Sequence, residues 1–176
     1  MTFSFRLTEE EYYKFNYYTA WADPRRKRYR INYFFRVILL YGLVAALYIF
    51  ASRPRLFWID ITVFFITGLA YLLLIPWLVK RSVQRKVASI LSKKENQHIL
   101  EESEIILSPE GIVDRDTLSE SRYSWEAIVH FAETEDAFYL YTNSHHAIVI
   151  PKRVIPGPTA MQEILNLLKA HLPLHV

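Results

Sequence analysis

The chain has 176 residues, no cysteine, four glycines and a formal net charge of +3. The absence of cysteine excludes disulfides and thiolate metal sites, and the small number of glycines argues against a glycine-rich phosphate loop. Residues 95–176 carry 13 Asp and Glu against 5 Lys and Arg, so the basic excess lies elsewhere and does not indicate binding to nucleic acid.

The first 22 residues predict a strand followed by a helix. Residues 2–7 alternate between apolar and polar side chains, which is typical of a strand with one buried face. Thr8 and Glu11 have the spacing of a capping box, and the helix that they open is expected to end near Ala22, before an Asp-Pro pair. Because a lone strand is not stable in water, we expect residues 1–22 to join the strand-rich region beyond residue 100.

Two long apolar runs predict a transmembrane helical hairpin over residues 33–79. The first run, Tyr33 to Ser52, contains one charged residue, Arg36. The second run, Leu56 to Val79, contains only Asp60. Runs of 20 and 24 residues are long enough for a hydrocarbon core of about 30 Å. The alternative is a buried hairpin in a soluble protein, and it needs more surrounding mass than a chain of this length offers.

Four residues within the spans carry further expectations. Pro76 is expected to kink the second helix, because it removes a backbone hydrogen bond. Gly42 and Ala46 have the spacing of a close helix-packing surface. Asp60 is an ionisable residue within a span, and such residues are candidates for a functional site. The alternative is that Asp60, which lies near the turn, reaches the headgroups or pairs with Arg55.

Basic residues gather at the two outer ends of the hairpin, six on each side, whereas the connecting turn has only Arg53 and Arg55. The positive-inside rule then places both termini in the cytoplasm and the turn outside. We call the two basic groups the basic collars and expect them to contact an anionic lipid bilayer. Residues 80–94 predict a basic helical extension, either a stalk docked on the domain or an interfacial helix. The collars comprise Arg25, Arg26, Lys27, Arg28, Arg30 and Arg36 on one side, and Lys80, Arg81, Arg85, Lys86, Lys93 and Lys94 on the other. The residues expected at the membrane surface are Arg25, Arg26, Lys27, Arg28, Arg30, Lys80, Arg81, Arg85 and Lys86.

Residues 95–176 predict short antiparallel strands and a closing amphipathic helix. A turn is expected at residues 108–111, and Thr159 with Gln162 has the spacing of a helix cap. The fold class is therefore α+β, a bent antiparallel sheet capped by a C-terminal helix, with the transmembrane hairpin inserted before it. Strands are expected near residues 104–107, 112–113, 121–125, 128–133, 137–142 and 146–150, and the apolar stripe of the helix is Ile164, Leu165, Leu168 and Leu172.

The sequence contains no catalytic signature and no metal-ligand spacing. His145 and His146 are adjacent, so in a strand they point to opposite faces and cannot hold one ion together. His130 is expected to be a structural histidine inside the domain. We therefore expect no enzymatic activity, no cofactor and no metal site.

Four residues are candidates for a binding surface. Tyr139 and Tyr141 form an aromatic face on one predicted strand, which is either a binding surface or is covered by the N-terminal helix. Lys152 and Arg153 are two of the few basic residues of an acidic region. They either meet a phosphate or an acidic partner loop, or are ordinary surface charges of little energetic weight.

Several stretches resemble the YcxB-like family of bacterial two-span membrane proteins. They follow two predicted spans and end in an Ile-Pro-Lys-Arg sequence, which is the most specific piece. The resemblance implies a pleckstrin-homology (PH)-like domain of seven strands and a C-terminal helix, in which residues 2–7 supply the strand missing from the C-terminal region. It brings no catalytic residues. The stretches are residues 104–112, 125–128, 138–141 and 147–153.

The function that we expect is a non-enzymatic, membrane-anchored protein-interaction module in the bacterial cytoplasmic (inner) membrane. Its partners are the anionic bilayer and a protein, either a different one or a second copy of the chain in a homo-oligomer. Two alternatives stay open. One is an immunity protein that neutralises a bacterial toxin at the inner membrane, and the other is an accessory subunit of an enzyme or transporter.

Overall fold

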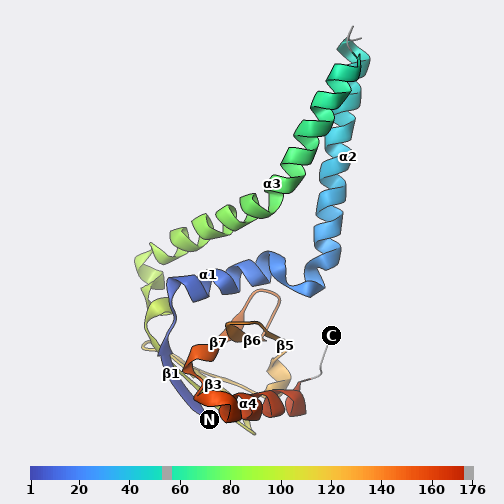
Figure 1. The fold of residues 1–176 in the computed structure, drawn as a ribbon. Helices are drawn as coiled ribbons and strands as arrows, with labels where there is room; N and C mark the ends of the chain where they lie inside the picture. Colours follow the sequence, from blue (N-terminus) through green and yellow to red (C-terminus); the bar gives the residue numbers. More distant parts are fainter. Residues whose placement is uncertain (53–56, 173–176) are drawn as a thin grey trace. The chain divides into compact units, whose positions relative to one another are not determined.

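The computed structural model describes residues 1–52 and 57–172, which form two units (Figure 1). One unit combines Met1–Ala20 with the chain from Arg85 onward, and the other is Trp21–Gln84. The turn that carries Arg53 and Arg55 lies outside the described residues. The first unit is called the domain below, and the second unit is the helical hairpin.

The domain contains two antiparallel sheets, in the strand orders β1-β2-β3-β4 and β5-β6-β7. Phe3 of β1 lies opposite Ile105 of β2, and Phe5 lies opposite Ser103. The prediction that the N-terminal strand pairs with strands beyond residue 100 is therefore confirmed. The strands are β1 (Thr2–Arg6), β2 (Glu102–Ser108), β3 (Gly111–Arg115), β4 (Glu120–Tyr123), β5 (His130–Glu133), β6 (Ala137–Tyr141) and β7 (Ala147–Pro151).

The turn between β2 and β3 lies where the sequence predicts it. Gly111 has a φ of +152°, and a Cβ atom at this position would lie 2.4 Å from the Tyr123 carbonyl oxygen, so glycine allows β4 to approach. Trp125 differs from its predicted strand position. It lies in the short 3-10 helix η4 (Trp125–Ala127), and its indole N–H donates to the carbonyls of Ser108 and Pro109 at 3.0 and 3.1 Å.

The C-terminal helix α4 (Gly157–His171) closes the main core. Ile164, Leu168 and Leu172 of the predicted apolar stripe are buried. The predicted cap at Thr159 is wrong, because the helix begins at Gly157 and has no side-chain cap. A proline directly after Gly157 has its φ already set for a first helical turn, so the helix starts earlier than the cap spacing indicates.

The N-terminal helix α1 (Glu9–Tyr17) opens with the predicted capping box of Thr8 and Glu11. It continues as one π-helical turn, η1 (Tyr18–Ala22), so the predicted end near Ala22 is confirmed. The 3-10 helix η2 (Pro24–Arg26) follows. Phe15 of α1 packs in a second, smaller aromatic cluster of the domain.

Two long helices form the hairpin, α2 (Lys27–Ser52) and α3 (Phe57–Leu91). The Tyr41 hydroxyl of α2 donates to the Phe64 carbonyl of α3 at 3.0 Å, and the rings of Tyr48 and Phe64 lie 5.4 Å apart. The two helices therefore lie side by side, and Figure 1 shows that they run in opposite directions. Continuation of α3 to Leu91 confirms that most of residues 80–94 extends the second helix, and a bend in α3 is visible in Figure 1. Pro76 is the proline inside it.

A close contact between the two helices is made at Gly68, and Gly42 of the predicted pair makes none. A Cβ atom at Gly42 would meet no heavy atom within 4 Å, so Gly42 makes no close contact with α3. A Cβ atom at Gly68 would lie 2.9 Å from Cε1 of Tyr41. The reason is that the aromatic ring fills the space between the helices, and the facing residue must then be small.

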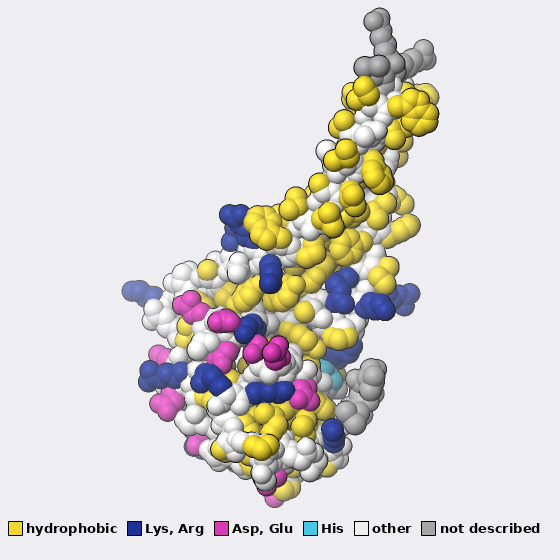
Figure 2. All heavy atoms as spheres, in the orientation of Figure 1, with side chains coloured by type: hydrophobic (Ala, Val, Ile, Leu, Met, Phe, Trp, Pro, Cys, Tyr) yellow, Lys and Arg dark blue, Asp and Glu magenta, His cyan; other side chains and the backbone are white. Residues whose placement is uncertain are grey.

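Both helices are long and apolar enough to cross a membrane. Figure 2 shows hydrophobic side chains covering them over most of their length. Phe50 is 83% exposed and Trp58 76% exposed, which is unusual for the core helices of a soluble protein. The α+β class, with two long apolar helices and antiparallel sheets that end in a C-terminal helix, is therefore confirmed.

The other described elements connect these parts. They are the 3-10 helices η3 (Lys94–Leu100), which precedes β2, and η5 (Lys152–Val154), which follows β7.

Candidate functional site

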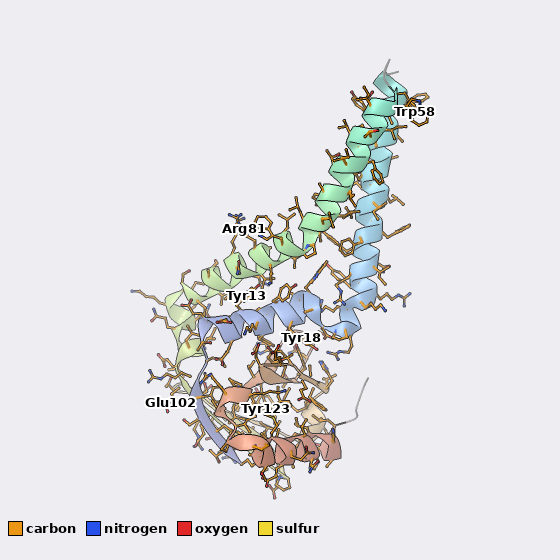
Figure 3. All side chains as sticks on the ribbon, viewed as in Figure 1. Tyr13, Tyr18, Trp58, Arg81, Glu102 and Tyr123 are labelled. Atoms are coloured by element: carbon orange, nitrogen blue, oxygen red, sulfur yellow. The ribbon has the colours of Figure 1, made fainter. Side chains whose placement is uncertain are left out.

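The aromatic residues of β6 do not form an open surface. Tyr139 and Tyr141 are 2% and 1% exposed. The ring of Phe15 lies 5.4 Å from that of Tyr139, and the Thr19 and Tyr141 hydroxyls are 2.7 Å apart in a hydrogen bond. The ring of Tyr18, labelled in Figure 3, lies at 5.4 Å from that of Tyr139. The expected binding surface is thus corrected, and the alternative in which the N-terminal helix covers this face holds.

Lys152 makes two contacts within the domain. Its Nζ atom lies 2.8 Å from Oε1 of Glu133 and 5.0 Å from the centroid of the Phe138 ring. The ammonium group therefore connects η5 to β5 and β6.

Arg153 connects the C-terminal part of the domain to its N-terminal part. Its guanidinium group donates to both carboxylate oxygens of Glu11, at 2.6 and 3.1 Å, and to the Arg6 carbonyl at 2.6 Å. Glu11 also accepts from the Thr8 N–H at 2.9 Å. The carboxylate thus caps α1 and holds η5 at the same time.

These cations border a shallow charged hollow of about 370 Å³. Besides Lys152 and Arg153, the hollow contains Lys14, which bridges Glu10 at 3.0 Å and Asp136 at 2.9 Å. Hydrogen bonds to Asp136 and Glu10 raise the pKa of Lys14. Because each of these cations has an acidic partner, the hollow has no excess positive field to attract a phosphate. Its lining residues are Thr8, Glu10, Glu11, Lys14, Glu135, Asp136, Lys152 and Arg153.

A different cavity of the domain, of about 310 Å³, is lined by two aspartates and by no lysine or arginine among the described residues, and we call it the acidic pocket. Strands β1, β2, β3 and β7 contribute to it, together with α1 and η3. Part of its wall is apolar, and the other part carries two aspartates and three histidines. The lining residues are Phe5, Leu7, Tyr12, Phe15, Asn16, His98, Ile99, Ser103, Ile105, Asp114, Asp116, His145, His146, Ala147, Ile148 and Val149.

Asp114 lies on the inner face of its sheet. It is directly opposite Ile105, which is buried in the main core, and it is two residues from the buried Ile112. Side chains two residues apart in a strand share a face, so the carboxyl group occupies a position that a core residue normally takes. Burial, together with the nearby charge of Asp116, raises the pKa of Asp114.

Asp116 has the opposite electrostatic situation. Burial raises the pKa of this group, but hydrogen bonds from the backbone of Leu118 and Ser119 and from the Ser119 hydroxyl lower it, as does the charge of His98. The net result is a pKa below the ordinary value. The backbone donors lie at 2.7 and 2.6 Å from Oδ1, and they hold the carboxylate in place.

Residues 107–168, which run from the end of β2 into α4, match the family model of YcxB-like proteins. This part of the chain is YcxB-like. The YcxB-like region includes both aspartates of the acidic pocket and Lys152 and Arg153 of the charged hollow. Comparison with curated proteins and with solved structures gives no match.

The histidines of the YcxB-like region take structural and surface positions. His130 is buried, and its ring stacks on that of Tyr141 at 4.3 Å. His145 and His146 are exposed, and Oδ1 of Asn143 accepts a hydrogen bond from the backbone N–H of each at 2.9 Å. Among residues 1–52 and 57–172, no group of three or more His, Cys, Asp or Glu side chains is placed to hold a metal ion.

The basic collars lie in and beside the hairpin, outside the YcxB-like region. Figure 2 shows Lys and Arg side chains at one end of the hydrophobic stretch. Arg25 pairs with Asp23 at 2.9 Å, and Arg30 donates to the Trp21 and Asp23 carbonyls. Arg81 lies over the Trp77 ring at 5.2 Å (Figure 3). Some collar residues thus support local structure in addition to carrying charge.

Sequence reasoning missed the acidic pocket. Its signal is a carboxylate at an inner-facing strand position, since Asp114 follows the apolar Ile112 by two residues. The second part of the pocket comes from Phe5 and Leu7, about a hundred residues away, and spacing along the chain does not reveal such a meeting.

Proposed function

We propose that this protein is a two-span protein of the bacterial cytoplasmic (inner) membrane, with both termini in the cytoplasm and a cytoplasmic domain that binds a partner protein without catalysing a reaction. The observation that carries the proposal is the exposure of large apolar side chains along both long helices. Phe50, Trp58 and Leu73 are 83%, 76% and 73% exposed. Apolar surface costs about 25 cal/mol per Å² in water, and a bilayer removes that cost.

The orientation is supported by charge. Each collar has six Lys and Arg residues, and the collars flank the ends of α2 and α3 that continue into the domain. Cytoplasmic flanks of membrane spans carry an excess of such residues. Each basic residue near an anionic leaflet contributes roughly 1 kcal/mol, so the collars also serve as the lipid-contacting part of the protein.

A PH-like fold is supported by the inventory of elements. Four strands and three strands form two antiparallel sheets, and α4 follows them and plugs the core. This is the arrangement that resemblance to the YcxB-like family implies for the domain. PH-like domains are binding modules, and fold alone does not identify what they bind.

Binding, rather than catalysis, is supported by the chemistry of the two hollows. The cations of the charged hollow pair with acids of the fold. The Asp116 carboxylate of the acidic pocket accepts from backbone groups of a turn. A cavity that has an apolar wall and a few fixed polar groups is typical of a recognition site.

Single-cysteine labelling tests the topology, and the absence of native cysteine makes each variant clean. A membrane-impermeant maleimide added to intact cells should label Ser52→Cys, whereas Thr2→Cys and Glu163→Cys should react only after the membrane is permeabilised. Labelling of either of the last two in intact cells contradicts the topology. Release of the protein from membranes by alkaline carbonate contradicts the two spans.

Purification in a mild neutral detergent tests the binding role. The full chain should retain a protein partner, or a second copy of itself, in a defined ratio, and the same complex should form when purified components are mixed. Turnover of a substrate by the purified chain would contradict the non-enzymatic assignment.

A further inference from the structure

We infer that the acidic pocket binds a basic side chain, arginine or lysine, of a partner protein. The inference rests on the proposed function, because it names the chemistry by which the domain would recognise its partner. It assigns a role to Asp114 and Asp116, which the contacts of the fold leave facing a cavity.

Charge complementarity is the first argument. The described residues that line the pocket include two aspartates and three histidines but no lysine or arginine. The surrounding region, residues 95–176, carries 13 acidic against 5 basic residues. Low-dielectric walls focus such a field, so a cationic group is drawn in and an anionic one is repelled.

Shape is the second argument. Phe5, Ile105 and Ile148 provide apolar wall, and Asp114 and Asp116 are carried by β3 and the turn after it. Arginine and lysine side chains match this pocket, because their aliphatic stem packs on apolar surface while their charged head contacts polar groups. A volume of about 310 Å³ accommodates one such side chain.

The unequal state of the two carboxylates is the third argument. Asp116 is fixed by the turn, so it is already oriented before a ligand arrives. Asp114 is partly desolvated beside another acid, which disfavours its charged form. A bound cation would pair with the charged Asp114 carboxylate and offset the cost of its burial, and this ion pair would strengthen binding.

The test uses the full chain in neutral detergent micelles and three peptides of the form acetyl-Gly-X-Gly-amide. X is arginine, lysine or citrulline, which is a neutral isostere of arginine. Binding is followed by NMR shifts of the Ile105 and Ile148 methyl groups. We expect saturable shifts with the arginine and lysine peptides, and at least tenfold weaker binding of the citrulline peptide. Equal binding of the citrulline peptide, or no saturable shift with either cation, overturns the inference.

Two variants localise the effect. Asp114→Asn keeps the shape of the side chain and removes its charge, so it should weaken binding of the arginine peptide at least tenfold. Glu163→Gln removes the same charge from the exposed surface of α4 and should leave the affinity unchanged. Unchanged affinity of the arginine peptide for Asp114→Asn overturns the assignment. If Asp114→Asn does not fold, the comparison of the arginine and citrulline peptides on the unmodified chain decides the assignment.

A last arm separates a protein side chain from a free polyamine. Spermidine should bind no more tightly than the arginine peptide, and tighter binding would overturn the assignment to a partner protein. The labelling experiment on Ser52→Cys and Thr2→Cys does not involve the pocket. A failed peptide titration with the expected labelling therefore rejects this inference alone and leaves the two-span topology standing.

Discussion

At the scale of single residues, Arg153 is a candidate for ligand binding by its sequence position, but its contacts stabilise the fold. Its guanidinium group reaches Glu11 and the Arg6 carbonyl, which belong to the N-terminal part of the domain. Burial raises the pKa of Glu11, but hydrogen bonds from Arg153 and Thr8 outweigh it, so the pKa lies below the ordinary value. A lowered carboxylate pKa stabilises the folded state at neutral pH, and this contribution is lost as the pH falls through the pKa of the folded state.

Arg153→Ala should therefore lower the free energy of unfolding at neutral pH by about 1–2 kcal/mol, toward the lower part of the range for charged hydrogen bonds because the guanidinium group is half-exposed. The loss of stability between roughly pH 7 and pH 3 should also be smaller than in the unmodified chain. Urea unfolding in neutral detergent, followed by tryptophan fluorescence at several pH values, measures both effects.

Arg122→Ala is the matched control for this prediction. Arg122 pairs with Glu120 at 2.9 Å, but its side chain is 78% exposed, so its removal should change stability by no more than about 0.5 kcal/mol. Similar losses in both variants would show that the Arg153 contacts are ordinary surface pairs.

At the scale of elements, the α2–α3 contact depends on one aromatic ring and one glycine. The ring of Tyr41 lies against Gly68, and its hydroxyl bonds to the Phe64 carbonyl. In a bilayer, helices gain little from apolar contact as such, so close packing and hydrogen bonds between helices decide their association.

Gly68→Leu should force the Tyr41 ring out of place and destabilise the hairpin by roughly 1–3 kcal/mol, as overpacking does in protein cores. Urea unfolding of the full chain in neutral detergent measures this change in free energy. Thermal unfolding of the same sample measures the change in melting temperature. Removing the ring as well, in Gly68→Leu with Tyr41→Ala, should recover part of the loss.

Gly42→Leu provides the comparison in the facing helix. A side chain there has no heavy atom within 4 Å of its Cβ position, so the change in stability should stay within about 0.5 kcal/mol. A larger effect at Gly42 than at Gly68 would contradict the assignment of the helix contact to Gly68.

At the scale of the whole molecule, the domain is assembled from two parts of the chain on either side of the hairpin. Met1–Ala20 belongs with the chain from Arg85 onward. Strand β1 supplies the buried Phe3 and Phe5, and α1 supplies Phe15. Without these residues, β2 has an unpaired edge and Tyr139 loses its cover.

A soluble chain that joins residues 1–22 to residues 95–176 through a long glycine-serine linker should melt at a higher temperature than residues 95–176 alone. Differential scanning calorimetry measures the difference. The same linked chain with Phe5→Ser and Phe15→Ser should lose most of the gain, because each buried phenylalanine contributes about 3 kcal/mol or more. Equal melting temperatures for the linked chain and the isolated C-terminal segment would refute a two-part domain.

Local features of the fold were predictable from the sequence. The capping box of Thr8 and Glu11, the alternation of residues 2–7 and the two apolar runs each depend on neighbours within a few turns, and such signals can be read from spacing. The cap predicted at Thr159 was wrong because a Gly-Pro pair two residues earlier starts the helix first.

Features that depend on distant parts of the chain were not predictable in the same way. Tyr139 has the alternation of an outward-facing residue, and only the arrival of α1 buries it. Gly42 and Gly68 are both glycines in apolar helices, and the register of α2 against α3 decides which one makes the contact. Asp114 and Phe5 both line the acidic pocket only because β1 pairs with β2 in the sheet.

Pairing of β1 with β2 also sets the order of events during synthesis. Phe3 lies opposite Ile105, so the first strand of the domain leaves the ribosome about a hundred residues before its partner. At 5–20 residues per second that interval is on the order of ten seconds, and both apolar helices emerge within it. In the proposed two-span protein the anchor is therefore inserted before the domain can close, and a product that stops short of β2 displays an unpaired strand edge for proteases to recognise.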